Sequence, residues 1–259
     1  MAICNKSIIL TSEDWHICRT AAVAFGMMIN FPDQDTQSLS EERIGSTDQI
    51  PRFANLRSAG RQLALQLETY RGADGVVILA PVLGGVPVAH EVANHLGKPL
   101  DFLIRRQLLL PQGPGSDINA VSVAGRTIID ERAPALPADP LTPLEHFLAD
   151  AIAGLQSRER ICRGTRPPLN LIDKIVILVD CGIHTGGNMR AAVTALRKTE
   201  SKQIIAAVPV TSHGGRDIVA ALADDFVSLA SPKPFGHVGL WYDDFSRPGD
   251  DEICKLLRL

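Results

Sequence analysis

Residues 174–190 read KIVILVDCGIHTGGNMR and combine a strand, a turn and the start of a helix. The run at 175–179 is wholly apolar, which predicts a strand buried on both faces, because helices cover both sides of a parallel sheet. Asp180 ends this strand, and the short loop at 181–187 leads directly into a helix predicted over 188–198. Ligands of open α/β sheets bind beyond the carboxyl ends of the strands, so we expect a ligand at this turn.

The turn has the features of an anion site. Gly186 and Gly187 let the backbone approach a ligand closely, and the following helix presents N–H groups with about half a positive charge. Thr185 and Asn188 add side-chain donors, while the carboxylate of Asp180 is suited to accept hydrogen bonds from sugar hydroxyls. A phosphate cradle beside a hydroxyl acceptor indicates a ribose 5-phosphate site. The alternative is an ordinary strand–turn–helix in which the glycines serve only the geometry of the turn.

Strands and helices alternate on both sides of this turn. An apolar run at 76–80 is followed by a helix at 87–96 and a strand at 100–104, a βαβ unit that implies parallel strands. Residues 1–50 form a predicted N-terminal extension made of one helix and a polar linker. The remaining elements are expected as helices at 56–70, 144–155 and 215–223 and as strands at 204–210 and 226–229.

The composition is that of a globular protein, because 45% of the 259 residues are hydrophobic, 21% are charged and the net charge is −3. The lack of a basic excess argues against nucleic-acid binding. The longest stretch without a polar side chain, residues 75–89, is too short to cross a membrane, so no membrane partner is expected. The five cysteines include no CxxC pair, and no signal-peptide pattern opens the chain, which predicts a cytoplasmic protein with reduced thiols.

The strand and loop VILVDCGIHTGG resemble the phosphoribosyl pyrophosphate motif of type I phosphoribosyltransferases. Further stretches, in order, are similar to a bacterial phosphoribosyltransferase-like subfamily of that family. They are ADGVVILAPVLGGVPVAHEVA at 73–93, PLDFLIRRQL at 99–108, RERICRGTRPPLNL at 158–171, AAVPV at 206–210 and PFGHVGLWYDDF at 234–245.

This resemblance implies an α/β fold with a parallel five-stranded sheet flanked by helices and a small hood over the base side of the site. It assigns residues 51–259 to the phosphoribosyltransferase-like domain. It also implies transfer of ribose 5-phosphate from phosphoribosyl pyrophosphate to an acceptor, with Mg²⁺ bound through the substrate and without a metal site of the protein's own. A small phosphoribosyl or nucleotide ligand and a homodimer are expected with it.

The resemblance also implies roles for particular residues. Asp180 and Cys181 are the implied catalytic residues, because they stand at the two acid positions of the motif, and Asp180 would hold the ribose hydroxyls. The implied 5′-phosphate loop consists of His184, Thr185, Gly186, Gly187 and Asn188, and the implied pyrophosphate loop consists of Leu83, Gly84 and Gly85. The implied residues on the base side are Trp241, Tyr242 and Asp243. Arg105 and Arg106 are the implied basic residues at the start of the flexible loop, and because neighbours on a strand point to opposite sides, only one of them enters the site.

Three positions that carry charge in the family are neutral in this chain. Cys181 replaces the second acid, Leu83 an arginine of the pyrophosphate loop, and Gln107 a lysine. A charge-assisted hydrogen bond contributes about 1.5–3 kcal/mol, and all three losses fall on the pyrophosphate and metal side. Two functions therefore stay open: a phosphoribosyltransferase, or a module that binds a nucleotide or sugar phosphate without turnover.

Four other features have two interpretations each. Cys181 and His184 form a thiolate–imidazole pair, or Cys181 is a bystander. Trp241 and Tyr242 stack on a heterocycle, or they pack the C-terminal segment onto the sheet. The arginines of residues 158–166 form a solvated helix end, or they contact an anion or a second subunit. The run Ser212-His213-Gly214-Gly215 is read as a glycine-rich helix start at the site rather than as part of a hydrolase.

Overall fold

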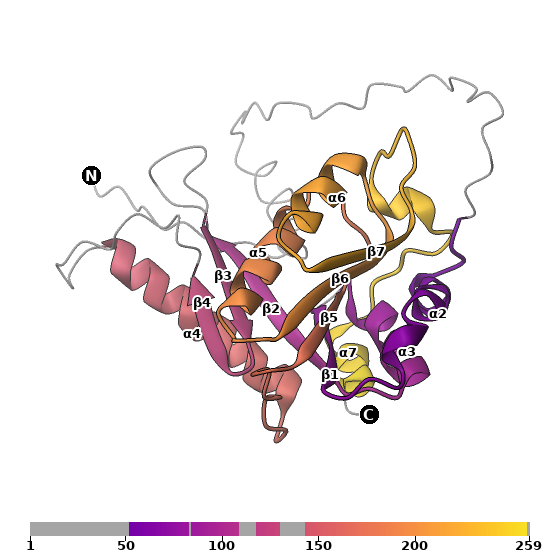
Figure 1. Ribbon diagram of the computed structural model, residues 1–259. Helices are drawn as coiled ribbons and strands as arrows, with labels where there is room; N and C mark the ends of the chain where they lie inside the picture. Colours follow the sequence, from indigo (N-terminus) through magenta and orange to yellow (C-terminus); the bar gives the residue numbers. More distant parts are fainter. Residues whose placement is uncertain (1–51, 83, 109–117, 130–142, 258–259) are drawn as a thin grey trace, which may run out of the picture. The chain divides into compact units, whose positions relative to one another are not determined.

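The computed structural model of the protein describes residues 52–82, 84–108, 118–129 and 143–257, which belong to one compact unit (Figure 1). The predicted extension at 1–50 and the loop residue Leu83 lie outside the described residues. The division of the chain at residue 50 therefore stays a prediction. No helix in the described part of the chain combines the length and the apolar character that a membrane crossing requires.

The centre of the unit is a seven-stranded sheet with the order β4-β3-β2-β1-β5-β6-β7. The five strands from β2 to β7 in this order are parallel, which confirms the predicted parallel five-stranded core, while β3 and β4 add an antiparallel hairpin on the β2 side. The strands are β1 (Val76–Pro81), β2 (Leu100–Leu108), β3 (Ile118–Val123), β4 (Arg126–Ile129), β5 (Ile175–Val179), β6 (Gln203–Val210) and β7 (Asp225–Ala230).

Helices connect the parallel strands and cover the sheet. The turn at 212 starts α6 (His213–Ala220), and Asn55 starts α2 (Leu56–Gln66) through a reciprocal capping box with Ser58. The other helices are α3 (Val86–Leu96), α4 (Pro143–Arg163), α5 (Gly187–Arg197) and α7 (Asp250–Leu256), together with the short 3₁₀ helices η1 (Glu68–Tyr70) and η2 (Val238–Trp241).

The central strands β1, β5 and β6 are buried on both faces of the sheet. Alternate side chains of β1 enter opposite layers: Ile78 and Ala80 pack in one hydrophobic cluster with residues of α2, α3 and α7, whereas Val77 and Leu79 pack in a second cluster with residues of α5. This arrangement explains why β1 and β5 are apolar at nearly every position, as strands covered on both sides must be.

The strand order reverses between β1 and β5, which lie side by side with Val76 opposite Ile175 and Leu79 opposite Leu178. From β1 the chain proceeds to β2 on one side, and from β5 it proceeds to β6 and β7 on the other. The connections that leave the carboxyl ends of β1 and β5 therefore diverge. A crevice at such a switch point is where open α/β sheets bind ligands.

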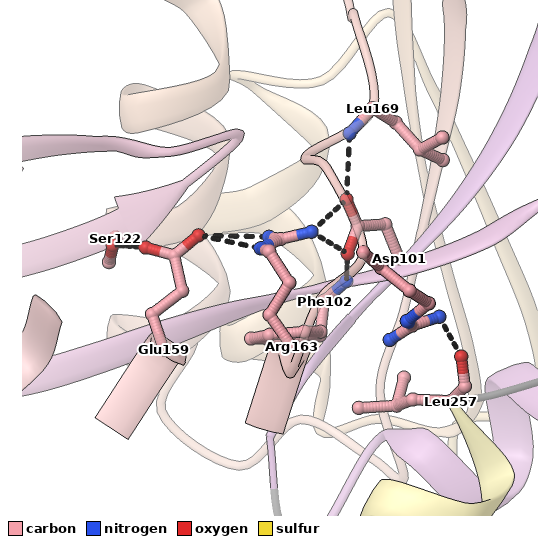
Figure 2. Close-up of polar contacts among 8 residues, drawn as sticks. Asp101, Phe102, Ser122, Glu159, Arg163, Leu169 and Leu257 are labelled. Carbon is pink, nitrogen blue, oxygen red and sulfur yellow. Dashed lines mark hydrogen bonds and ion pairs between the residues drawn. The ribbon is translucent and has the colours of Figure 1, made fainter. Parts of the chain in front are cut away.

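The C-terminal end of α4 carries a buried ion network (Figure 2). Arg163 donates from Nη1 to both carboxylate oxygens of Asp101 at 3.0 Å, and from Nη2 to Glu159 Oε1 at 2.9 Å. The Ser122 hydroxyl donates to the second oxygen of Glu159. The network links α4 to β2 and β3. The expectation of a solvated helix end is therefore wrong for Arg163, although Arg158 and Arg160 are exposed.

Candidate functional site

A cavity of about 500 Å³ lies at the carboxyl ends of β1 and β5. It collects residues from the β1–α3 turn, from β2, from the β5–α5 turn and from the segment around η2. The described residues that line it are Pro81, Val82, Gly84, Leu103, Arg105, Asp180, Cys181, Gly182, Ile183, His184, Thr185, Gly186, Gly187, Asn188, Met189, His237, Val238, Gly239, Phe245 and Arg247.

Asp180 occupies the position directly after β5 and is buried, with 8% of its surface exposed. The backbone N–H of Cys181 donates to Asp180 Oδ1 at 2.7 Å. Burial raises the pKa of the Asp180 carboxyl to about 6, against the effect of the Cys181 hydrogen bonds and of the Arg247 and Arg105 charges. A ligand that donates hydrogen bonds to this buried carboxyl would stabilise its ionised form.

The loop from His184 to Asn188 lines the cavity as one continuous stretch. Gly186 precedes α5 with φ +79°, a left-handed conformation that glycine adopts without strain, and no side chain caps the helix within the described residues. The N–H groups of the first turn of α5 are therefore available to an anion, with the helix dipole adding to the attraction.

The β1–α3 turn lies against the end of β5 and the residues that directly follow it. A Cβ atom at Gly84 would stand 3.0 Å from Cys181 Sγ, and one at Gly85 would stand 2.7 Å from the carbonyl oxygen of Val179. A side chain at Gly85 would therefore clash with the backbone of β5, and one at Gly84 would crowd the Cys181 side chain. Gly84 lines the cavity and Gly85 is buried behind it, whereas Leu83 lies outside the described residues.

The two arginines of β2 point to opposite sides of the sheet, as neighbours on a strand do. Arg105 lines the cavity and donates to Asn119 Oδ1 at 2.6 Å. Burial lowers the pKa of the Arg105 guanidinium, and the charge of Asp180 opposes that shift. Arg106 lies on the α4 side, where a Cβ atom at Gly154 would be 3.0 Å from its Nη1 atom.

Within the described residues, no hydrogen bond joins the Cys181 thiol to the His184 imidazole. Burial, followed by the charge of Asp180, raises the pKa of the Cys181 thiol well above its usual value, so the thiol is neutral at physiological pH. The His184 ring stacks on Phe235, with the ring centres 5.7 Å apart. The geometry favours the interpretation of Cys181 as a bystander.

Trp241, Tyr242 and Asp243 are not among the residues that line the cavity. Tyr242 is 2% exposed, and its hydroxyl donates to the carbonyl oxygen of Cys181. The Trp241 indole donates to the carbonyl oxygen of Phe235 at 3.0 Å, and Asp243 is exposed and paired with Arg52. Their positions favour packing of the C-terminal segment over direct contact with a base.

Neighbouring residues of the same segment line the cavity in their place. They are His237, Val238, Gly239, Phe245 and Arg247, and sequence reasoning missed them as site residues. Arg247 stands 5.7 Å from the Phe245 ring and is near enough to Asp180 to lower its pKa. The motif PFGHVGLWYDDF pointed to a segment that lines the cavity, but which of its side chains face inward depends on the fold of η2.

The fold and the cavity together define an α/β protein with an anion-binding turn at the switch point of its sheet. Residues 46–243 match the family described as phosphoribosyl transferase domain. Because this match covers most of the chain, the chain belongs to that family, which agrees with the resemblance in its motifs.

Similar proteins agree with this assignment. Two curated proteins, each named "Putative phosphoribosyl transferase" and each from a strain of Mycobacterium tuberculosis, are 36% identical over 211 residues, which make up 79% of this chain and 46% of theirs. The chain thus spans about half the length of these relatives. The crystal structure of TT1426 from Thermus thermophilus has a TM-score of 0.63 and 29% identity, covering 80% of this chain and 97% of that one.

Proposed function

We propose that this protein binds the ribose 5-phosphate part of phosphoribosyl pyrophosphate in the cavity and transfers it to an acceptor. The observation that carries the proposal is that Asp180 and the uncapped first turn of α5 face the same cavity. Asp180 can accept hydrogen bonds from the ribose hydroxyls, while the N–H groups of the first turn of α5 bind the 5′-phosphate.

Each lining group has a role in this proposal. The 5′-phosphate binds the amides of Thr185–Asn188, and the ribose hydroxyls donate to Asp180. Arg105 and Arg247 supply positive charge to the pyrophosphate, and Val238 and Phe245 offer an apolar wall to a ring of the acceptor. The bond between ribose C1 and the pyrophosphate oxygen breaks, and pyrophosphate leaves with the electron pair. A lone pair of the acceptor forms the new bond to C1, and the proton that the acceptor loses passes to the released pyrophosphate or to water.

We propose that Mg²⁺ enters with the substrate. Asp180 is the one carboxylate among the described residues lining the cavity, which suits an ion held mainly by substrate oxygens and water. The described residues contain no group of three His, Cys, Asp or Glu that could hold a metal on its own. A bound Mg²⁺ would neutralise charge on the departing pyrophosphate. The homodimer and the cytoplasmic location stay predictions.

A second candidate function is binding without turnover. It is favoured by the neutral residues at positions 83, 107 and 181, which remove charge where pyrophosphate and metal would bind. The binding module would keep the phosphate loop and take a nucleoside monophosphate or a sugar phosphate.

Isothermal titration and a pyrophosphate-release assay separate these functions. A transferase binds phosphoribosyl pyrophosphate more tightly with Mg²⁺ than without it, and releases pyrophosphate slowly even by hydrolysis. A binding module takes ribose 5-phosphate or a nucleoside monophosphate equally well with and without Mg²⁺ and releases none. Failure to bind any of the three ligands would refute both functions.

A further inference from the structure

The turn before α6 lies against the candidate phosphate loop without lining the cavity. Ser212 is the N-cap of α6, and its hydroxyl oxygen accepts a hydrogen bond from the Gly215 N–H at 2.9 Å. The same hydroxyl donates to the carbonyl oxygen of His184, the first residue of the loop. One side chain thus connects the start of α6 to the start of the loop.

Backbone pairing places the two segments side by side. The N–H of Ile183 donates to the carbonyl oxygen of Val210 at 3.0 Å. The N–H of Ser212 donates to the carbonyl oxygen of Ile183 at 2.9 Å. Ile183 and Thr211 form a parallel bridge beyond the ends of β5 and β6. The pairing of the two strands is therefore resumed after Asp180, immediately before the loop.

Contact between the segments is closest at Gly215. A Cβ atom there would stand 2.5 Å from the carbonyl oxygen of His184 and 2.6 Å from Ile183 Cγ2. A Cβ atom at Gly186 would stand 3.1 Å from the carbonyl oxygen of Gly215. At Gly214, one position earlier in the same helical turn, nothing lies within 4 Å of a Cβ atom.

We propose that Ser212 and Gly215 are positioning residues that hold the amides of the β5–α5 loop in the direction an anion requires. The first turn of α5 has no side-chain cap of its own among the described residues, so the loop needs support from outside. Preorganised donors bind an anion more strongly than donors that must be ordered on binding. The proposal rests on the proposed function for the identity of the anion.

The adjacent glycines offer a matched test. Gly214→Ala and Gly215→Ala both raise helix propensity at the start of α6, but only the second meets the loop. Isothermal titration of the full chain with ribose 5-phosphate should give Gly214→Ala the wild-type dissociation constant. Gly215→Ala should weaken binding by about tenfold, the size expected when one ordered hydrogen bond of about 1.4 kcal/mol is lost.

The hydroxyl is tested separately. Ser212→Ala should weaken binding about threefold to tenfold, and Ser212→Thr, which keeps the hydroxyl, should restore it to within about twofold. All titrations are run well below the melting temperature of each variant, where a residue with a merely stabilising role leaves the dissociation constant unchanged. Equal affinities for Gly214→Ala and Gly215→Ala, or no rescue by threonine, would overturn the proposal.

Hydrogen exchange of the Thr185–Asn188 amides in the ligand-free protein tests the positioning role without depending on ribose 5-phosphate binding. Exchange should be faster in Gly215→Ala and Ser212→Ala than in the wild type and in Gly214→Ala. If the wild type binds no ribose 5-phosphate but exchange follows this order, the proposed function fails while the positioning role stands. If exchange at these amides is the same in all variants, the positioning role fails.

Discussion

Two buried aspartates of the same sheet have opposite surroundings. Asp101, on β2, accepts hydrogen bonds from Arg163 on both oxygens and from the backbone N–H groups of Phe102 and Leu169 (Figure 2). Asp180, after β5, accepts from the Cys181 backbone and forms no ion pair within the described residues. The acceptor capacity of Asp101 is used within the protein, whereas that of Asp180 faces the cavity. A buried carboxylate thus indicates a ligand site only when the protein itself does not supply the hydrogen bonds and the cation that the carboxylate needs.

Breaking the network around Asp101 should have the largest effect. Arg163→Met leaves Asp101 and Glu159 buried without their cation, which should cost about 3–5 kcal/mol of unfolding free energy. Urea unfolding measures this cost. Arg160→Met, on an exposed position of the same helix end, should change stability by less than about 0.5 kcal/mol. A stability loss shared equally by both variants would show that the buried pairing is not the cause.

The pH dependence of stability should reveal the state of Asp180. Its pKa in the folded protein, about 6, is above the unfolded value, so the folded state binds more protons between about pH 4 and pH 6. Stability is therefore lost as the pH rises through that window, by up to about 3 kcal/mol at 1.4 kcal/mol per pKa unit. Asp180→Asn should remove this loss. Parallel stability curves for the two proteins from pH 4 to pH 7 would contradict the raised pKa.

Ligand binding should separate Asp180 from acids outside the cavity. Asp180→Asn keeps the shape but removes the charge, and should weaken binding of ribose 5-phosphate by about 1.5–3 kcal/mol. Above pH 6, where the wild-type carboxyl is ionised, the difference between the two proteins should be largest. Asp243→Asn is the control, since Asp243 is exposed and does not line the cavity. Isothermal titration with ribose 5-phosphate measures both variants, and a loss at Asp243→Asn as large as that at Asp180→Asn would contradict the placement of the ribose hydroxyls at Asp180.

Arg247 should have a smaller effect, confined to ligands with a pyrophosphate group. Arg247 lines the cavity and is exposed, so Arg247→Gln should weaken binding of phosphoribosyl pyrophosphate by about 1 kcal/mol. Binding of ribose 5-phosphate should change by less. Titration of the variant with both ligands checks this, and equal losses for the two would assign Arg247 to the 5′-phosphate or the ribose.

The smallest effect is expected at Cys181. Cys181→Ser should change ligand binding by less than about 1 kcal/mol, because a buried neutral thiol makes no charged contact. Iodoacetamide should alkylate Cys181 more slowly than the partly exposed Cys254. Rapid alkylation of Cys181, together with loss of turnover in the serine variant, would identify a nucleophile and overturn the bystander interpretation.

Most of the parallel sheet was predictable, because its signals are local. β5 occupies the same residues in sequence and structure, and α5 begins at Gly187 rather than Asn188. The hairpin of β3 and β4 was missed, because its strands mix polar residues such as Asn119 and Ser122 with apolar ones. Asn119 instead binds Arg105, and Ser122 binds Glu159, so both are buried polar residues satisfied by partners distant in the sequence.

The candidate site divides in the same way. Residues 180–188 were predicted as one unit because a strand, a glycine turn and a helix start follow one another within a few positions, and the cavity includes all of them. Their roles toward a ligand stay predictions. The side chains of the C-terminal segment were assigned less well: Tyr242 faces the core, and Phe245 and Arg247 face the cavity.

The sequence by itself determined the alternation of strands and helices, the family, and the succession of strand, glycine turn and helix around residues 180–188, because each depends on neighbours along the chain. The tertiary structure alone decided the burial of Arg163, the choice of Arg105 rather than Arg106 as the arginine that lines the cavity, and the contact of Gly215 with the loop. Each of these joins segments far apart in the sequence. The physical reason is that hydrophobic periodicity specifies which side of an element is buried, while the partner of a buried polar group is known only after the elements have packed.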